Sequence, residues 1–348
     1  MNEDALLKSA AIIALSELIH NAQVNKRTIH NNYPVHTFGR LTSKRDRSVQ
    51  DEWIPHLSRE LKKAVENRDS VMIQTLIVAL GKIGDPKILS VFEPYLEGKQ
   101  PMTTFQRTMI VAALGKLADT HPRLARSVLY KIYLNTMEHH DLRCTAVFLL
   151  MKTDPPLSML QRMAELTNTD TSRQVNSAVK STLENLARLD SPEWENMAKK
   201  ARAVKNLLAS DDESFRFSHG FMSNLSPTAS EKNIMIQTIL NYIGSDDSLI
   251  PKAVYYATFS TFGDFKLPPT EIIAMVSSVR SLMDLALKDK YDENTVKMAA
   301  EKIAEELNIM ADEATPLEGN LMWDVKFITR FLPFNKDMLQ KLPLSEYQ

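Results

Sequence analysis

The sequence predicts an all-α protein built as a helical solenoid. Three similar apolar segments recur along it, at Val71–Lys82, Gln106–Lys116 and Arg143–Lys152. Their landmark leucines, Leu80, Leu114 and Leu150, and more weakly Leu183, are spaced by roughly 33 to 36 residues, the period of paired-helix repeats. The chain has only 9 glycines in 348 residues, which argues against a turn-rich β protein.

The N-terminal region, residues 1–190, is expected to form one helical layer of these repeats. It begins with a helix over residues 5–22, and helical periodicity returns over residues 51–68. Between them, residues 24–50 lack a helical period and contain a proline, a glycine and a basic cluster. A loop of this length in a compact fold often meets a partner or is disordered. The basic contact segment consists of Arg40, Lys44, Arg45 and Arg47.

The helices of the three repeats are apolar nearly all round, whereas the helices between them have one apolar stripe. Asp85-Pro86, Asp154-Pro155 and Ser191-Pro192 are typical of helix starts, because a capping side chain precedes a proline. Helices that are apolar all round are buried on more than one side. Stacked repeats could achieve this burial by themselves, or a second layer could cover the outer surface.

The register breaks between about residues 190 and 230 and then resumes. The segment Ile234–Gly244 echoes the first repeat, and two amphipathic helices are expected at about 270–288 and 293–308. Residues 191–320 are therefore predicted to be a second run of helices. Residues 321–348 form an aromatic tail, in which Phe327, Phe331 and Phe334 are typical of an extended segment.

Composition excludes several classes of protein. The net charge is −1, so nothing steers the whole chain toward nucleic acid or an anionic membrane. No apolar run reaches the roughly 18 residues of a membrane span. The apolar run Ser9–Ile19 follows two acidic residues and lacks a small-residue cleavage site, so it is interpreted as a helix and not as a signal peptide. The single cysteine, Cys144, excludes an internal disulfide.

The residues that could carry chemistry are few. His139, His140 and Cys144 form the one metal-like cluster, in which His140 and Cys144 share a helix face while His139 points elsewhere. Zinc takes about four ligands, and the sequence offers no second half for this site, so we expect no bound metal and no other cofactor. No nucleotide-binding, serine-hydrolase or zinc-protease motif is present, and we predict that the chain is not an enzyme.

Four longer segments resemble the helical domain of insect vitellogenins, particularly the bee and wasp forms. They are Tyr95–Pro101, Phe148–Ala164, Arg173–Glu184 and Gly244–Pro251, and the stretch 148–184 is the most specific. Asn32–Arg40 and Ala300–Leu307 fit the same family. The resemblance covers almost the whole chain.

The resemblance implies a two-layer, right-handed α–α superhelix, HEAT-like and bent into a horseshoe. In that family it clasps β-sheets that line a lipid cavity, in a secreted protein of haemolymph and egg yolk that carries phospholipid and neutral lipid. The implied partners are therefore lipid and the β-sheet and β-barrel domains of a longer parent chain. Contact with a membrane surface is a separate hypothesis, based on the charge of the basic segment. The resemblance also implies that this chain is the helical shell alone, without the sheets, and it does not identify which residues face lipid or sheet.

A second hypothesis from a different class stays open. Ala79–Pro86 is also typical of free-standing HEAT-like scaffolds that bind protein partners. Lipid bound to the purified chain would distinguish the carrier from the scaffold.

Overall fold

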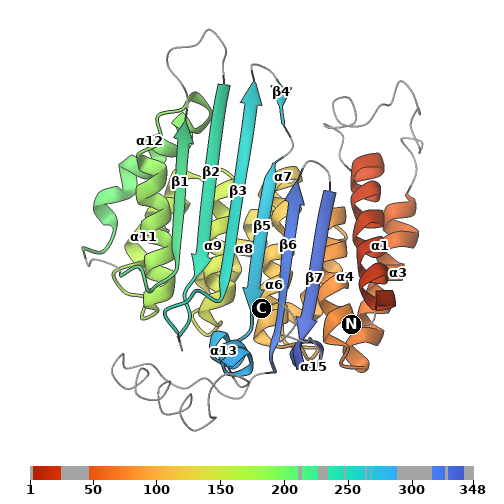
Figure 1. The fold of residues 1–348 in the computed structure, drawn as a ribbon. Helices are drawn as coiled ribbons and strands as arrows, with labels where there is room; N and C mark the ends of the chain where they lie inside the picture. Colours follow the sequence, from red (N-terminus) through yellow and green to blue (C-terminus); the bar gives the residue numbers. More distant parts are fainter. Residues whose placement is uncertain are drawn as a thin grey trace. The chain divides into compact units, whose positions relative to one another are not determined.

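A computed structural model describes residues 3–24, 47–210, 214–225, 234–246, 248–262, 265–267, 269–287, 316–325 and 328–340. The chain divides into two compact units, residues 2–154 and residues 155–348 (Figure 1). Each unit has its own architecture: the first is helical, and the second combines helices with a sheet.

The first unit contains helices in the order α1 (Glu3–Ile19), α3 (Ile54–Glu66), α4 (Ser70–Ile83), α5 (Ile88–Leu96), α6 (Thr104–Ala113), α7 (Gly115–Thr120), α8 (Pro122–Leu134) and α9 (His140–Lys152). Two π-helical turns, η1 (His20–Val24) and η2 (Val49–Trp53), follow α1 and precede α3. The helices predicted around Leu80 and Leu150 are confirmed as α4 and α9, and Leu114 lies at the junction of α6 and α7.

Helix α4 lies at the centre of this unit, packed against α1, α3 and α6. Its start and end follow from local chemistry. The Asp69 carboxylate accepts a hydrogen bond from the Met72 N–H at 3.0 Å, and Gly84 ends the helix with a φ of 65°, which favours glycine. Leu76 and Leu80 are fully buried, as an apolar-all-round helix requires.

The two repeated Leu-Gly-Lys sequences bring two lysines to one carboxylate. Lys116 Nζ lies 2.6 Å from Glu17 Oε1, and Lys82 Nζ lies 3.6 Å from Glu17 Oε2. Beside them, His20 Nδ1 lies 2.8 Å from the Ile83 carbonyl oxygen, to which it donates. This network joins α1 to the ends of α4 and α7, in a region where an unpaired charge would be costly.

The second unit begins with helices α10 (Leu157–Leu166), α11 (Arg173–Ala187) and α12 (Glu195–Val204), together with the 3₁₀ turns η3 (Pro192–Trp194) and η4 (Lys205–Leu207). The strands are β1 (His219–Leu225), β2 (Ile234–Ile243), β3 (Ala253–Phe262), β4 (Phe265–Lys266), β5 (Thr270–Val276), β6 (Glu318–Val325) and β7 (Ile328–Asn335). Two short helices, α13 (Val279–Leu287) and α15 (Lys336–Gln340), complete the described elements.

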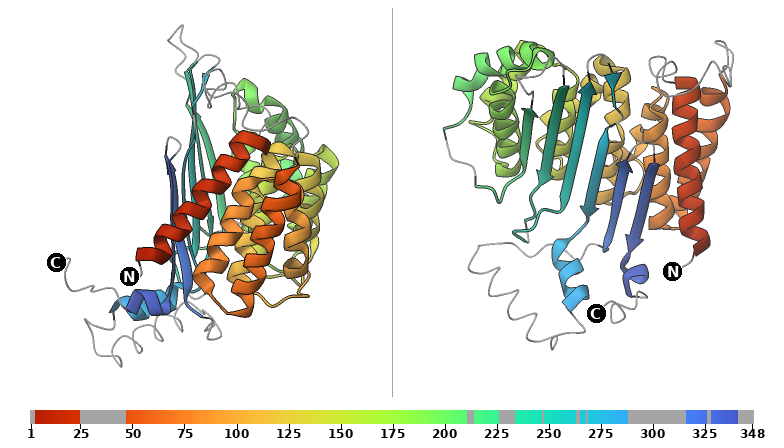
Figure 2. Two further views of the ribbon diagram at one scale, coloured as in Figure 1. Left: turned by 90° about the vertical axis from the view of Figure 1, so that its right-hand side faces the viewer. Right: turned by 45° about the horizontal axis from the view of Figure 1, so that its top comes forward.

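The strands form one antiparallel sheet with the order β1-β2-β3-β5-β6-β7, and β4 pairs with β3. Figures 1 and 2 show these strands as a single layer. Helix α11 lies along β1 and supplies hydrogen bonds to its backbone: Ser181 Oγ accepts from the Gly220 N–H at 3.0 Å, and Asn185 Nδ2 donates to the Gly220 carbonyl at 3.1 Å. These side chains protect the backbone of an edge strand, which would otherwise pair with other chains.

The sheet shows that the predicted fold class is wrong. The chain is not an all-α, two-layer superhelix of HEAT-like repeats, because the segment expected to be a second run of helices forms five strands between His219 and Val276 and keeps only α12 and α13 as α-helices among its described residues. Ile234–Ile243, expected to repeat the α4 sequence, is β2, and Thr270–Val276 is β5. The residues of the second amphipathic helix, 293–308, lie outside the described residues. The aromatic tail expected at residues 321–348 contains part of β6 and all of β7. Phe327 of that tail also lies outside the described residues.

The reason lies in the residue types. Ile234–Ile243 contains four isoleucines and one threonine, whose β-branched side chains favour a pleated strand. The periodicity of an apolar run of this length does not distinguish a buried helix from a buried strand. Pairing with β3 along the full length of β2, and with β1 from Ile236 to Tyr242, decides in favour of the strand. In the described residues no helix is long and apolar enough to cross a bilayer.

Candidate functional site

One face of the sheet in the second unit is apolar and accessible. Because side chains alternate along each strand, the register determines which residues share a face. One row crosses the sheet as Phe221, Leu240, Tyr256, Ile272 and Trp323 and ends at the exposed Arg330 of the edge strand β7. The next row is His219, Tyr242, Val254, Ala274, Leu321 and Leu332. We call the surface formed by these two rows the open face.

Exposure separates the two faces of the sheet. On the open face Ile272 is 41% exposed, and Leu321 and Trp323 are each 36% exposed. On the other face Ala257 and Phe331 are buried. Along β6, buried and exposed side chains therefore alternate, as expected of a sheet with one covered face.

A row of small hydroxyl side chains borders the apolar rows toward one end of the strands. It runs through Ser223, Thr238, Thr258 and Thr270, which are partners in register. The open face is therefore a broad apolar surface with a polar margin. Soluble proteins rarely expose contiguous apolar patches of more than a few hundred Å², and such patches mark interaction surfaces.

Aromatic rings gather where β1 and β2 meet. The ring of His219 stacks against Phe221, Tyr242 and Phe215, with centroid separations of 5.7, 5.6 and 5.4 Å. The Tyr242 hydroxyl donates to the Phe215 carbonyl at 2.7 Å, and burial raises the pKa of this tyrosine. Phe215 itself is 75% exposed, so the cluster reaches solvent.

His219 also contacts helix α11. Its Nδ1 lies 2.7 Å from the Phe217 carbonyl and 3.1 Å from Ser177 Oγ. A carbonyl only accepts, so Nδ1 carries a hydrogen, and this nitrogen cannot take the proton of Ser177. The pair therefore lacks the arrangement of a serine nucleophile and its base.

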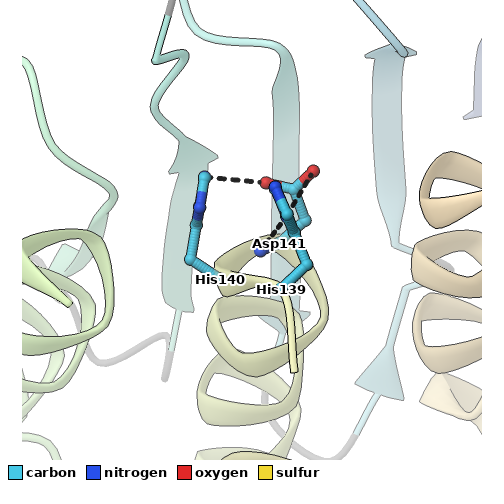
Figure 3. A group of neighbouring side chains, drawn as sticks. All are labelled: His139, His140 and Asp141. Atoms are coloured by element: carbon cyan, nitrogen blue, oxygen red, sulfur yellow. Dashed lines mark hydrogen bonds and ion pairs between the residues drawn. The ribbon is translucent and has the colours of Figure 1, made fainter. Parts of the chain in front are cut away.

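The metal-like cluster of the first unit differs from the sequence expectation in its third member. His139 and His140 lie at the start of α9 with ring centroids 4.3 Å apart, and they flank the Asp141 carboxylate (Figure 3). His140 Nε2 is 2.9 Å from Asp141 Oδ1, and His139 Nδ1 is 3.4 Å from Asp141 Oδ2. Cys144 is buried further along α9. The geometry brings a carboxylate to the histidines where the sequence pattern suggested a thiol.

The basic contact segment cannot be placed as a surface. Arg40, Lys44 and Arg45 lie outside the described residues. Arg47 is exposed and forms an ion pair of 3.5 Å with Asp51, one helical turn along the chain. An exposed pair of this kind contributes little to stability.

Sequence reasoning did not find the open face. Both faces of β2 and β3 are rich in apolar residues, so no clean alternation distinguishes them in the sequence. One signal of a strand was available: Ala253–Phe262 is rich in β-branched and aromatic residues, which favour strands.

The comparisons match both parts of this architecture, the helices and the antiparallel sheet. The family model described as "Vitellogenin TPR domain" matches residues 1–184, and the one described as "Vitellinogen, open beta-sheet" matches residues 216–346. The chain belongs to the vitellogenin family. It includes the open-sheet segment of that family, so the expectation of a helical shell without sheets is wrong.

Individual relatives agree. The chain is 41% identical over 345 residues to Vitellogenin-1 of Solenopsis invicta, covering 98% of this chain and 21% of the relative. It is 35% identical to Vitellogenin-A1 of Aedes aegypti, covering 97% and 18%, and 36% identical to Vitellogenin of Bombyx mori, covering 100% and 20%. The chain thus spans about a fifth of the length of these relatives.

A solved structure titled "Lipid-protein interactions in lipovitellin" shares the fold. Its TM-score is 0.70 at 18% sequence identity, over 97% of this chain and 31% of that one. At this identity the match supports the fold alone.

Proposed function

We propose that this chain contributes a lipid-contacting wall to a larger secreted lipid-transport and yolk-storage protein. The observation that carries the proposal is the open face, where Ile272, Leu321 and Trp323 remain accessible in a sheet whose other face is buried. Acyl chains would cover this apolar area, at roughly 25 cal/mol per Å² removed from water. The lipovitellin structure, whose title names lipid–protein interactions, supports the same use of the fold.

The proposed cargo is phospholipid and neutral lipid, as the family resemblance implies, and the remaining domains of a longer chain would close the site. Secretion into haemolymph and deposition in egg yolk belong to the same proposal. The chain acts here as a carrier and not as a catalyst.

Trp323 lies on the open face and provides the test. The chain has three tryptophans, so Trp53→Phe with Trp194→Phe leaves Trp323 as the sole fluorophore. Lipid with brominated acyl chains quenches tryptophan on contact. We expect strong quenching of Trp323, and much weaker quenching in a matched variant that retains Trp53 alone.

A charge placed on the open face should prevent binding. Ile272→Lys is expected to weaken lipid binding severalfold, since a desolvated ammonium is costly next to acyl chains. The control is Leu134→Lys, which places the same charge at a similarly exposed leucine at the end of α8. Equal quenching in both single-tryptophan variants, or no effect of Ile272→Lys on binding, would favour the free-standing protein-interaction scaffold.

A further inference from the structure

A polar pocket lies beside the open face, within the second unit. It is a half-open hollow of about 390 Å³, lined by α11, by η4 with the three residues that follow it, and by the first residue of β1. The side chains that matter for its chemistry are Ser177, Lys180, Glu184, Lys205 and His219. A pocket of this size, with a few convergent polar groups, is suited to a small polar molecule or to one end of a larger one.

The pocket presents both signs of charge. Lys180 and Glu184 are four residues apart on α11 and therefore lie on the same helix face, and Lys205 approaches from η4. A simple anion would be attracted by the lysines and repelled by Glu184. A group that carries a negative and a positive charge a few ångströms apart satisfies both.

The fully buried Ser177 hydroxyl helps to hold the His219 ring at the edge of the pocket. His219 Nδ1 donates its hydrogen to the Phe217 carbonyl, at 2.7 Å, so at 3.1 Å from Ser177 Oγ it is not an acceptor for the serine hydroxyl. The groups that can reach a ligand in the pocket are therefore the ammonium groups of Lys180 and Lys205 and the carboxylate of Glu184. Phosphate oxygens are strong acceptors for ammonium groups.

His219 joins the pocket to the open face. Its ring lines the pocket and also stacks with Phe221 and Tyr242, which belong to the two rows of the open face. A single amphipathic molecule could thus place a charged end in the pocket and an apolar body on the sheet.

We propose that this pocket binds the zwitterionic phosphodiester headgroup of a lipid whose acyl chains lie on the open face. Lys205 and Lys180 meet the phosphate, and Glu184 meets the ammonium group. The proposal rests on the proposed function, since it requires the open face to hold acyl chains.

The test compares four soluble probes by isothermal titration calorimetry. They are dihexanoylphosphatidylcholine, dihexanoylglycerol, which has the same chains without the headgroup, phosphocholine, which is the headgroup without chains, and inorganic phosphate. We expect dihexanoylphosphatidylcholine to bind at one site and more tightly than the other three. Lys205→Gln and Glu184→Gln should each weaken it by about tenfold, the value of one charge-assisted hydrogen bond, and leave dihexanoylglycerol unchanged.

Matched controls exist on the neighbouring helix. Lys199→Gln and Glu195→Gln make the same charge changes at an exposed ion pair of α12 and should leave every affinity unchanged. Equal binding of dihexanoylphosphatidylcholine by the pocket variants and the wild type would overturn the headgroup site. So would tight binding of inorganic phosphate alone that Lys205→Gln abolishes, since that result identifies a site for free anions. Failure of dihexanoylglycerol and dihexanoylphosphatidylcholine alike would instead reject the lipid-carrying function.

Discussion

The ring of Phe334 on β7 lies against Gly319, its register partner on β6. A Cβ atom at position 319 would overlap Cζ and Cε2 of that ring and would lie 2.8 Å from the Met275 carbonyl oxygen on β5. Three strands therefore approach at a position where there is no space for a side chain. Close approach, and not an unusual φ, is the requirement for glycine here.

Gly319→Ala should destabilise the sheet. Overpacking of this kind costs about 1–3 kcal/mol, which would appear as a lower urea midpoint. The double variant Gly319→Ala with Phe334→Leu should recover part of the loss, because the smaller side chain makes room. Gly115→Ala is the control, since a Cβ there meets only Leu149 at 3.8 Å. Unchanged stability in Gly319→Ala would show that the strands separate easily at this point.

The ion network of the first unit should make folding sensitive to acid. Burial is the larger cause, and the positive charge of Lys116 the next, of a pKa of His20 that is lowered from 6.5 to about 4. Burial alone would raise the pKa of Glu17, but Lys116 and Lys82 outweigh it and lower that pKa. Between pH 6.5 and about 4 the unfolded chain binds a proton at His20 that the folded chain does not, so unfolding becomes easier as the pH falls.

Glu17 acts in the same direction at lower pH, because its stabilising charge is lost as the pH falls through its lowered pKa. At 1.36 kcal/mol per pKa unit, the His20 contribution is at most about 3 kcal/mol. Urea midpoints at several pH values measure it. His20→Asn keeps a donor for the Ile83 carbonyl without a titrating ring, so its stability should fall less steeply below pH 6.5. A parallel decline in wild type and variant would exclude His20 as the source.

The helical unit was predictable because its signals are local. Leu80 and Leu150 repeat at a solenoid period, Asp69 and Gly84 bound α4, and Thr103 with Gln106 forms a capping box at the start of α6. Each of these features is contained within a few residues of sequence. In the metal-like cluster of α9 the structure adds the Asp141 carboxylate to the two histidines, a group that the sequence pattern did not single out.

The sheet was not predictable in the same way because its pairings are distant. Ile272 of β5 pairs with Trp323 of β6, about 50 residues further along the chain, and neither segment reveals its partner. The open face exists only once those strands are in register. The pocket beside His219 likewise depends on α11 meeting β1, whose contacts join Ser177 and Ser181 to residues about 40 positions away.

The histidine cluster of α9 is expected to retain no zinc. Two imidazoles and one carboxylate are fewer than the four protein ligands of a closed structural site. In addition, His139 Nδ1 accepts a hydrogen bond from the Asp141 N–H at 3.3 Å, so this nitrogen is not free to bind a metal. Metal content after dialysis against a chelator tests this expectation. The expectation would be contradicted by one zinc per chain that is lost in His140→Ala. Loss of that zinc in Cys144→Ala would contradict it too, since the cluster expected from the sequence includes Cys144.

Apolar area, and not charge, should drive binding to this chain. The open face contributes Ile272, Leu321 and Trp323 to an accessible patch, and no charge is needed for a neutral lipid or an uncharged dye to bind there. Binding of Nile red should therefore change little between about 0.05 and about 0.5 M salt, whereas attraction between exposed charges is strongly screened at the higher concentration. A fourfold variant, Arg40→Gln with Lys44→Gln, Arg45→Gln and Arg47→Gln, should bind the dye as well as the wild type. The same variant also tests whether the basic contact segment binds membranes. If those residues hold anionic vesicles, both high salt and the four substitutions should release the vesicles. Loss of dye binding at high salt, or in the fourfold variant, would show that the basic contact segment and not the open face holds the ligand.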